Sequence, residues 1–259
     1  MKDVQRQTPE HPLYINKVGV KGLKYPIVVL DKARKDQHTV ASLNIYVDLP
    51  REFKGTHMSR FIEVLNEYRQ EIHIKKFEHI LEEIKKSLGA SSAHLEISFP
   101  YFIEKKAPVT GAAGLMEYRC KLIGTVGENK DFRVGVKVPV QTLCPCSKEI
   151  SDNGAHNQRG IVSVVVRYNS FFWIEDLIAI VEECASSPVY PILKRPDEKY
   201  VTEYAYDHPM FVEDVVREVA SRLDKRKEFS WYSVEAENFE SIHNHNVYAY
   251  IESTHNEGK

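Results

Sequence analysis

One polar stretch of this sequence reads Leu143-Cys144-Pro145-Cys146-Ser147-Lys148-Glu149-Ile150-Ser151-Asp152-Asn153-Gly154-Ala155-His156-Asn157-Gln158-Arg159-Gly160. It holds two cysteines, one histidine, two carboxylates and two glycines, and it lies between apolar, strand-like runs at 132–140 and 161–168. Such a segment is poor material for a hydrophobic core, whereas flanking strands can hold a polar loop in place for chemistry. We therefore expect a functional loop here.

The cysteines and the histidine of this stretch suggest a metal site. In an extended segment Cys144 and Cys146 would point to the same side, and we expect Pro145 to keep the segment from becoming helical. A thiolate with the imidazole of His156 suits zinc, ferrous iron or another borderline metal. At most three local ligands are too few for a structural zinc site and favour an open position for water. A redox dithiol and two unrelated buried thiols are the alternatives.

Four motifs in order give a resemblance to a known family. The string CPCSKEISDNGAHNQRG at 144–160 resembles the signature of the type IB GTP cyclohydrolases, prokaryotic enzymes of the tunnelling fold. GTHMSRF at 55–61, LKRPDEKYVTEYAYDHPMFVED at 193–214 and ESIHNHNVYAY at 240–250 also resemble family motifs. The resemblance therefore covers the chain from about residue 55 to residue 252.

The composition excludes several other classes. The chain has 259 residues, of which 42% are apolar and 28% charged, as in soluble globular proteins. A net charge of −2 gives no electrostatic reason to expect nucleic-acid binding. No apolar run reaches about 18 residues, so we expect no membrane span. Four cysteines do not form a disulfide framework, and we expect a cytoplasmic, reducing location.

Hydrophobic periodicity predicts an α+β fold with the order β-β-α-α-β-β in each half. The first half has strand pieces over 18–30, a strand over 38–48, helices over 59–69 and 74–88, and strands over 93–102 and 117–126. The second half has strands over 132–140 and 161–168, helices over 174–185 and 210–223, and strands over 228–238 and 245–252. This repeat predicts two fused modules, 1–127 with an N-terminal extension and 128–259 with the metal-site residues.

The resemblance implies a more specific architecture. It implies tandem tunnelling-fold modules, each an antiparallel sheet backed by paired helices. In the family such modules assemble into a ring with sites at subunit edges. We therefore expect a homo-oligomer, most simply a homotetramer.

The resemblance also implies a metal-ligand set. In the family a glutamate completes the metal site with a cysteine and a histidine, which here implies Cys144, His156 and Glu198, with water in the open position. Sulfur, nitrogen and oxygen donors together should make the choice of metal permissive, so we expect one zinc, manganese or ferrous ion per site. Without the resemblance, Glu198 would be one residue of a solvated, charged loop over 194–199.

Glu213 is the expected anchor of the purine. It lies at the start of the last long helix, where the helix dipole alone favours a carboxylate. The resemblance implies that it accepts hydrogen bonds from the 2-amino and ring N–H groups of guanine. Adenine would leave buried groups unpaired, so such a contact would discriminate between the bases.

The remaining candidates would move protons or bind phosphate. His243 and His245 alternate before a strand, and as imidazoles they suit general acid–base catalysis, although surface positions explain them equally well. Glu240 is a candidate to orient one of them or to bind the ribose, and Cys146 to assist the metal-bound water or to contact the substrate. The candidates for the triphosphate of GTP are His57, Ser59, Arg60, Lys148 and Arg159.

These expectations add up to a GTP cyclohydrolase I. The resemblance implies a metal-dependent hydrolase that converts GTP and water into formate and 7,8-dihydroneopterin triphosphate, the first step of tetrahydrofolate and pterin biosynthesis. One alternative is an archaeal-type enzyme that uses ferrous iron and releases a cyclic-phosphate dihydroneopterin. A nitrile reductase of the same fold is disfavoured because no reductase motif is present. A non-catalytic purine-binding module with a structural metal is the alternative from another class.

Overall fold

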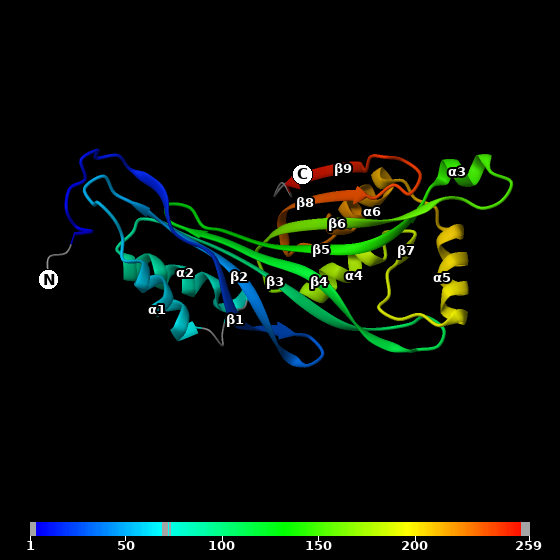
Figure 1. The fold of residues 1–259 in the computed structure, drawn as a ribbon, viewed down its shortest axis with the longest axis horizontal. Helices are drawn as coiled ribbons and strands as arrows, with labels where there is room; N and C mark the ends of the chain where they lie inside the picture. The colour runs from blue at the N-terminus through cyan, green and yellow to red at the C-terminus, as the bar shows by residue number, and fades with distance from the viewer. Residues whose placement is uncertain (1–3, 69–71, 73, 255–259) are drawn as a thin grey trace. The chain divides into compact units, whose positions relative to one another are not determined.

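The computed structural model describes residues 4–68, 72 and 74–254, and Figure 1 follows them by colour. Packing divides the chain into two compact units, Met1–Pro100 with Lys121–Val134 and Tyr101–Cys120 with Gly135–Lys259. The boundary between 127 and 128 came from element order rather than from packing, and it stays a prediction. Among the described residues, no helix is long and apolar enough to cross a membrane.

The first half of the sequence has the predicted element order. Its elements are β1 (Ile15–Asp31), β2 (Lys35–Leu49), α1 (Met58–Tyr68), α2 (Ile74–Leu88), β3 (Ala93–Lys106) and β4 (Ala113–Val126). The predicted strand pieces over 18–30 are one strand, because β-bulges absorb the irregular positions, among them Gly22 with a φ of 71°. Arg69, the last residue of the predicted first helix, lies outside the described residues.

The second half contains the predicted elements and three more. Its elements are β5 (Asp131–Leu143), α3 (Pro145–Ile150), β6 (Asn157–Tyr168), α4 (Ile174–Glu182), β7 (Ser187–Pro188), α5 (Arg195–Asp207), α6 (Val212–Leu223), β8 (Phe229–Asn238) and β9 (Val247–Thr254). The additional elements are α3, β7 and α5. The hydrogen-bonded strand order is β1-β2-β3-β4-β5-β6-β8-β9, with β7 paired to β5, which confirms the predicted antiparallel α+β fold.

The prediction that Pro145 prevents a helix was wrong. Pro145 is the first residue of α3, a position where the missing N–H is not needed and the fixed φ suits the helix. Cys144 is the N-cap, with its sulfur accepting from the N–H of Ser147. Cys144 and Cys146 are therefore not on one side of an extended segment, and Cys146 is exposed on α3.

The predicted loop over 194–199 was wrong for a similar reason. Pro196 lies in the first turn of α5, and Asp197 caps this turn by accepting from the main-chain N–H of Lys194 at 2.9 Å. Proline disrupts the interior of a helix but is well tolerated in its first turn. Glu198 is consequently an exposed residue in the first turn of a helix.

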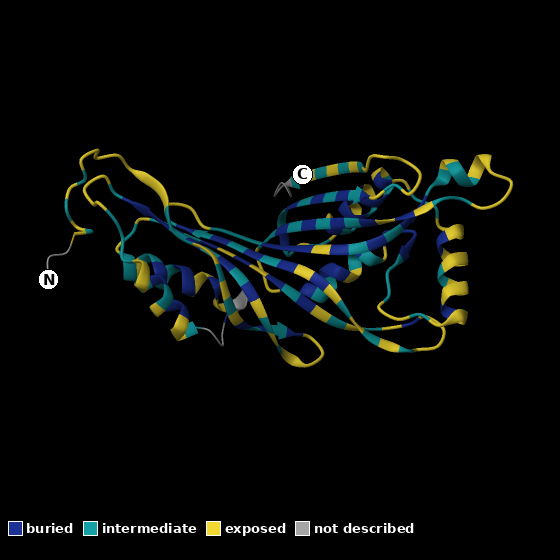
Figure 2. Ribbon diagram, viewed as in Figure 1, coloured by how far each residue is buried: buried dark blue, intermediate teal, exposed yellow. Residues whose placement is uncertain are grey.

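Each unit buries the apolar rows of its helices. In the first unit Gly124 gives room to α2, because a Cβ there would lie 2.5 Å from Leu81 and 2.6 Å from Phe77. In the second unit α6 packs on β8 and β9 and buries Val215 and Val219. Each fully buried valine contributes about 1.5–3 kcal/mol of transfer free energy. Figure 2 shows the buried residues spaced along the strands.

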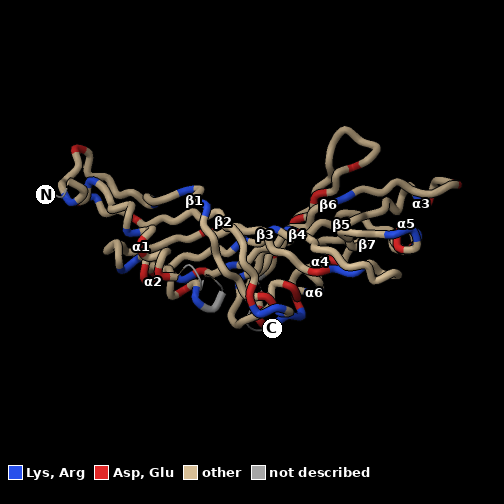
Figure 3. The backbone as a smooth tube through the Cα atoms, turned by 60° about the horizontal axis from the view of Figure 1, so that its bottom comes forward, with Lys and Arg blue, Asp and Glu red and all other residues tan. Residues whose placement is uncertain are grey.

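The outer face of α6 is polar. Figure 3 shows acidic and basic residues side by side on this helix. Arg217 lies 3.2 Å from Asp214, and Arg222 lies 3.0 Å from Glu218, at the spacing of neighbours on a helix surface. The helix therefore has one apolar face against the strands and one charged face toward solvent.

Candidate active site

The stretch from 143 to 160 is a loop closed at its base. The main-chain N–H of Cys144 donates to the carbonyl of His156 at 3.1 Å, and the N–H of His156 donates to the hydroxyl of Ser147 at 2.9 Å. Gly154 has a φ of +83°, a conformation that favours glycine, and it lets the chain turn back. The predicted approach of His156 to Cys144 is thus built into the ends of β5 and β6.

The start of α6 joins this loop. The N–H of Met210 donates to the carbonyl of Leu143 at 3.0 Å, so the segment before α6 lies beside the end of β5. The side chain of Asp214 accepts from the N–H of Phe211 at 3.2 Å and caps the first turn. Glu213, in the same turn, is exposed in the single chain, as a carboxylate that meets a ligand from solvent should be.

The segment after β8 lies beside the 143–160 loop and is the third segment of the candidate site. The N–H of Phe239 donates to the carbonyl of Arg159 at 2.9 Å and continues the pairing of β8 with β6. This places Glu240 Oε2 3.8 Å from His156 Nδ1. Further along, the rings of His243 and His245 stack, with centroids 5.1 Å apart.

These segments enclose a pocket of about 240 Å³ in the second unit. Six of the candidate residues line it: Cys144, His156, Glu213, Glu240, His243 and His245. They come from three motifs that lie far apart in the sequence. Met210, Phe211 and Val212 add an apolar wall. An apolar surface with a few convergent polar groups is the usual composition of a small-molecule site.

Two polar lining residues were not predicted from the sequence. Gln158 accepts from His156 Nδ1 at 3.1 Å and donates to Thr142 Oγ1 at 2.8 Å. This pair of hydrogen bonds favours the tautomer of His156 that carries its proton on Nδ1. Its Nε2 is then the nitrogen with a free electron pair. Asn238 is the second missed residue. The sequence offered only a weak signal for these two residues. Each is a polar residue at one of the alternate positions of its strand that are otherwise buried and mostly apolar.

Four other candidates do not line this pocket. Cys146 is exposed on α3, and Arg159 is exposed on β6. The Nζ of Lys148 donates to the main-chain carbonyl of Tyr206 and lies 4.2 Å from the centroid of the Tyr206 ring. Glu198 is on α5, and the described residues contain no group of three or more Cys, His, Asp or Glu side chains placed to hold a metal. The metal-ligand set therefore stays a prediction.

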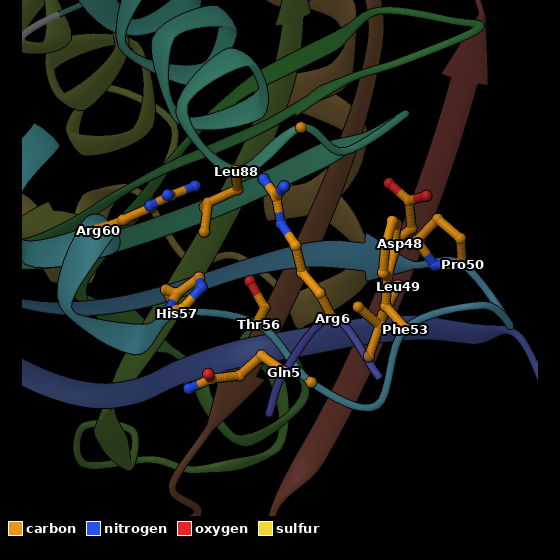
Figure 4. Close-up of a pocket in the computed structure, with 12 residues that line it drawn as sticks. Gln5, Arg6, Asp48, Leu49, Pro50, Phe53, Thr56, His57, Arg60 and Leu88 are labelled. Atoms are coloured by element: carbon orange, nitrogen blue, oxygen red, sulfur yellow. The ribbon is translucent and has the colours of Figure 1, made fainter. Parts of the chain in front are cut away.

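The remaining phosphate candidates belong to the first unit. His57 and Arg60 line a pocket of about 110 Å³ at the start of α1, whereas Ser59 does not. Figure 4 shows Arg6 beside them, a residue that the sequence analysis had not singled out. Arg60 also donates to the carbonyl of Ser87 at 3.0 Å, which fixes its position against the end of α2. The guanidinium groups of Arg6 and Arg60 suit a phosphate group, although the carboxylate of Asp48 also lines this pocket.

Comparison with known proteins agrees with the motifs. A family model described as type I GTP cyclohydrolase folE2 matches residues 1–249. A GTP cyclohydrolase FolE2 of Syntrophus aciditrophicus is 64% identical over 253 residues, which cover 97% of this chain and 99% of the relative. One from Geobacter sulfurreducens is 61% identical over 252 residues, with 97% and 98% covered.

Solved structures extend the agreement to the fold. A uricase from Arthrobacter globiformis aligns with a TM-score of 0.53 at 10% identity and covers 94% of this chain and 95% of its own. The urate oxidase of Bacillus sp. TB-90 gives 0.53 at 9% identity, with 94% and 100% covered. At such low identity the likeness concerns the fold alone, and it confirms the expected tunnelling fold.

Proposed function

This chain belongs to the family of type I GTP cyclohydrolases described as folE2, and from that premise we propose that its active site is the pocket of the second unit. It is an enzyme of the first step of folate biosynthesis. The observation that carries the proposed location is that six candidate residues from three separate motifs line this one pocket. The reaction converts GTP and water into formate and 7,8-dihydroneopterin triphosphate.

The pocket would bind the base of GTP rather than the whole nucleotide. Its volume of about 240 Å³ is below the roughly 300–1,000 Å³ of complete ligand sites. Glu213 would accept from the 2-amino and ring N–H groups of guanine, while Phe211 and Val212 cover the ring. The ribose and triphosphate then extend out of the pocket.

The sulfur of Cys144 and the imidazole of His156 support the proposal of a divalent metal ion in this pocket. Cys144 offers a sulfur and His156 offers Nε2, because Gln158 occupies Nδ1. A ligating histidine held through its other nitrogen is the usual arrangement in metal sites. The proposed third ligand is Glu198, and the proposed ion is zinc, manganese or ferrous iron. When bound, such an ion acts as a Lewis acid toward water.

Proton transfer would fall to the groups on the segment after β8. His243 and His245 lie at the open side of the pocket and are proposed as general acid and base. Glu240, beside His156, would orient an imidazole or bind the ribose. Cys146 stays a candidate for a substrate contact from α3.

Exposed apolar side chains beside the pocket support the proposal of an oligomer. Phe211, Phe239 and Ile242 are 40%, 42% and 64% exposed around the site, and exposed apolar groups of this kind mark interfaces. We propose a homo-oligomeric ring, most simply a tetramer, in the cytoplasm. His57, Ser59, Arg60, Lys148 and Arg159 are the proposed triphosphate contacts.

The test is direct. Metal-depleted protein is reconstituted with zinc, manganese or ferrous iron, given GTP, and assayed for formate and for product mass. We expect formate and dihydroneopterin triphosphate only after reconstitution. A cyclic-phosphate product would favour the archaeal-type reaction, and bound GTP without formate would favour a binding module.

A further inference from the structure

One asparagine of the candidate site, Asn238, has no side-chain partner among the described residues. Asn238 is the last residue of β8, is 3% exposed and lines the pocket with Cys144, His156 and Glu213. Its side chain forms no hydrogen bond with any other residue of the described part of the chain. The amide atoms of Asn238 are not among the fully buried atoms that lack a partner in the described residues, so they are reachable from the pocket, where a ligand can supply the hydrogen bond that a polar side chain in such a site needs.

The fold places Asn238 under the start of α6. Val234, Ala236 and Asn238 alternate on the buried face of β8, so the amide occupies a position where the row is otherwise apolar. At the other end of this row the hydroxyl of Tyr232 donates to Asp224, at the end of α6, at 2.7 Å. The helix thus runs along β8 with its first turn, which contains Glu213, over Asn238.

A glycine provides the space for this amide. Gly160 is the register partner of Asn238 on β6. A Cβ at position 160 would lie 2.4 Å from Asn238 Oδ1 and 3.0 Å from the carbonyl of Glu237. Any side chain at 160 would therefore push the amide out of its present position.

The neighbouring amide cannot take the same role. Gln158 also lines the pocket, but its oxygen is bonded to His156 and its nitrogen to Thr142. Asn238 is left as the lining amide whose N–H groups are available to a ligand.

We propose that Asn238 Nδ2 donates a hydrogen bond to O6 of the guanine base that Glu213 holds. This inference rests on the proposed function. Guanine presents two N–H donors and, next to them, the carbonyl acceptor O6, so a carboxylate matches the donors and an amide N–H₂ matches the carbonyl. Adenine has an amino group in place of O6, and Asn238 would add a second point of discrimination against it.

The experiment compares two nucleotides that differ at one atom. GTP and 6-thioguanosine triphosphate, in which a weakly accepting sulfur replaces O6, are titrated by calorimetry into the metal-depleted full-length protein. We expect the parent to prefer GTP. Asn238→Ala should weaken GTP binding about tenfold and the thio analogue little, because one hydrogen bond is lost. The ratio of the two affinities should fall toward one.

Two further variants sharpen the result. Asn238→Asp keeps the size but removes the donor, and it should weaken GTP at least as much as Asn238→Ala. Asn246→Ala is the matched control, because this asparagine bonds Glu237 at 2.7 Å, does not line the pocket and should leave both affinities unchanged.

Four outcomes would overturn the inference. An equal loss for both nucleotides would make Asn238 a structural residue, and full GTP affinity in Asn238→Asp would remove it from the base contact. If Glu213→Gln weakens GTP while the Asn238 variants do not, this inference fails and the proposed function stands. A parent protein that binds no GTP would overturn both.

Discussion

The main-chain N–H of Cys144 and the main-chain carbonyl of His156 are joined by a hydrogen bond of 3.1 Å. This contact closes the loop that contains α3, and it sets the thiol and the imidazole at the neighbouring ends of β5 and β6. Their proximity is thus a property of two paired strands rather than of a flexible loop. A site built in this way is pre-organised before any ligand binds.

Replacing Cys144 should remove both metal and turnover. Cys144→Ala takes away the sulfur donor of the pocket, and we expect a large fall in metal content by elemental analysis together with loss of formate release. Cys146→Ala is the matched comparison, because this cysteine is exposed outside the pocket and should leave metal content near that of the parent. Full occupancy in Cys144→Ala would refute the assignment.

The third metal ligand can be identified by comparing two carboxylates. Glu198→Ala should lower metal affinity, with part of the metal retained by the two remaining donors. Glu240→Ala should keep the metal and lower turnover, because Glu240 is proposed to act on a histidine or on the ribose. The reverse pattern would make Glu240 the ligand.

Glu213→Gln should weaken GTP binding by roughly tenfold to a hundredfold, with metal retained. The substitution keeps the size but sets an amide donor against the donors of guanine, which costs on the order of 1–3 kcal/mol. Calorimetric titration measures the effect. Glu218→Gln, on the charged face of the same helix, should leave GTP affinity unchanged. Equal affinity in the parent and Glu213→Gln would remove Glu213 from the site.

His243→Ala and His245→Ala should each lower turnover by about 10² to 10⁴, the usual contribution of a general acid or base. Metal content and GTP affinity should stay near those of the parent, because neither histidine is a proposed ligand or base anchor. A formylated pyrimidine that accumulates in one variant would assign that histidine to steps after ring opening. Loss of metal in either variant would make it a ligand instead.

Asp197→Asn should loosen α5 and lower the melting temperature by several degrees. Asp197 is fully buried and accepts from the N–H groups of Val109, Thr110 and Lys194 and from the hydroxyl of Thr110, at 2.7–2.9 Å. Burial opposes its ionisation, but these hydrogen bonds outweigh it and lower the pKa of Asp197.

The pH dependence of this effect has a definite sign. Because the folded-state pKa is depressed, the contribution of Asp197 is complete above the unfolded value of about 3.9 and is lost progressively as the pH falls from there through the lower folded-state pKa. The difference in melting temperature between the parent and Asp197→Asn should therefore be constant near neutrality and shrink in acid. Asp207→Asn, at the exposed end of α5, is the control. A difference that grows in acid would contradict this account.

Local sequence patterns predicted the order of most helices and strands and marked six residues that line the candidate pocket. Alternating and helical periodicities are local, so the strands and the helix at 74–88 were predicted closely. The motifs around Cys144, Glu213 and His243 marked three segments as functional. No local pattern predicts that these segments line one pocket. Proline was misread at 145 and 196 because the first turn of a helix tolerates it as well as a loop does.

Which polar residues share the pocket depends on long-range strand pairing. Gln158 and Asn238 are separated by 80 positions in the sequence, and the pairing of β6 with β8 sets them into one wall beneath the start of α6. The same pairing makes Gly160 a spacer for an amide. Strand register is a long-range contact that no single segment specifies, and a shift by one residue would turn both amides to the opposite face of the sheet.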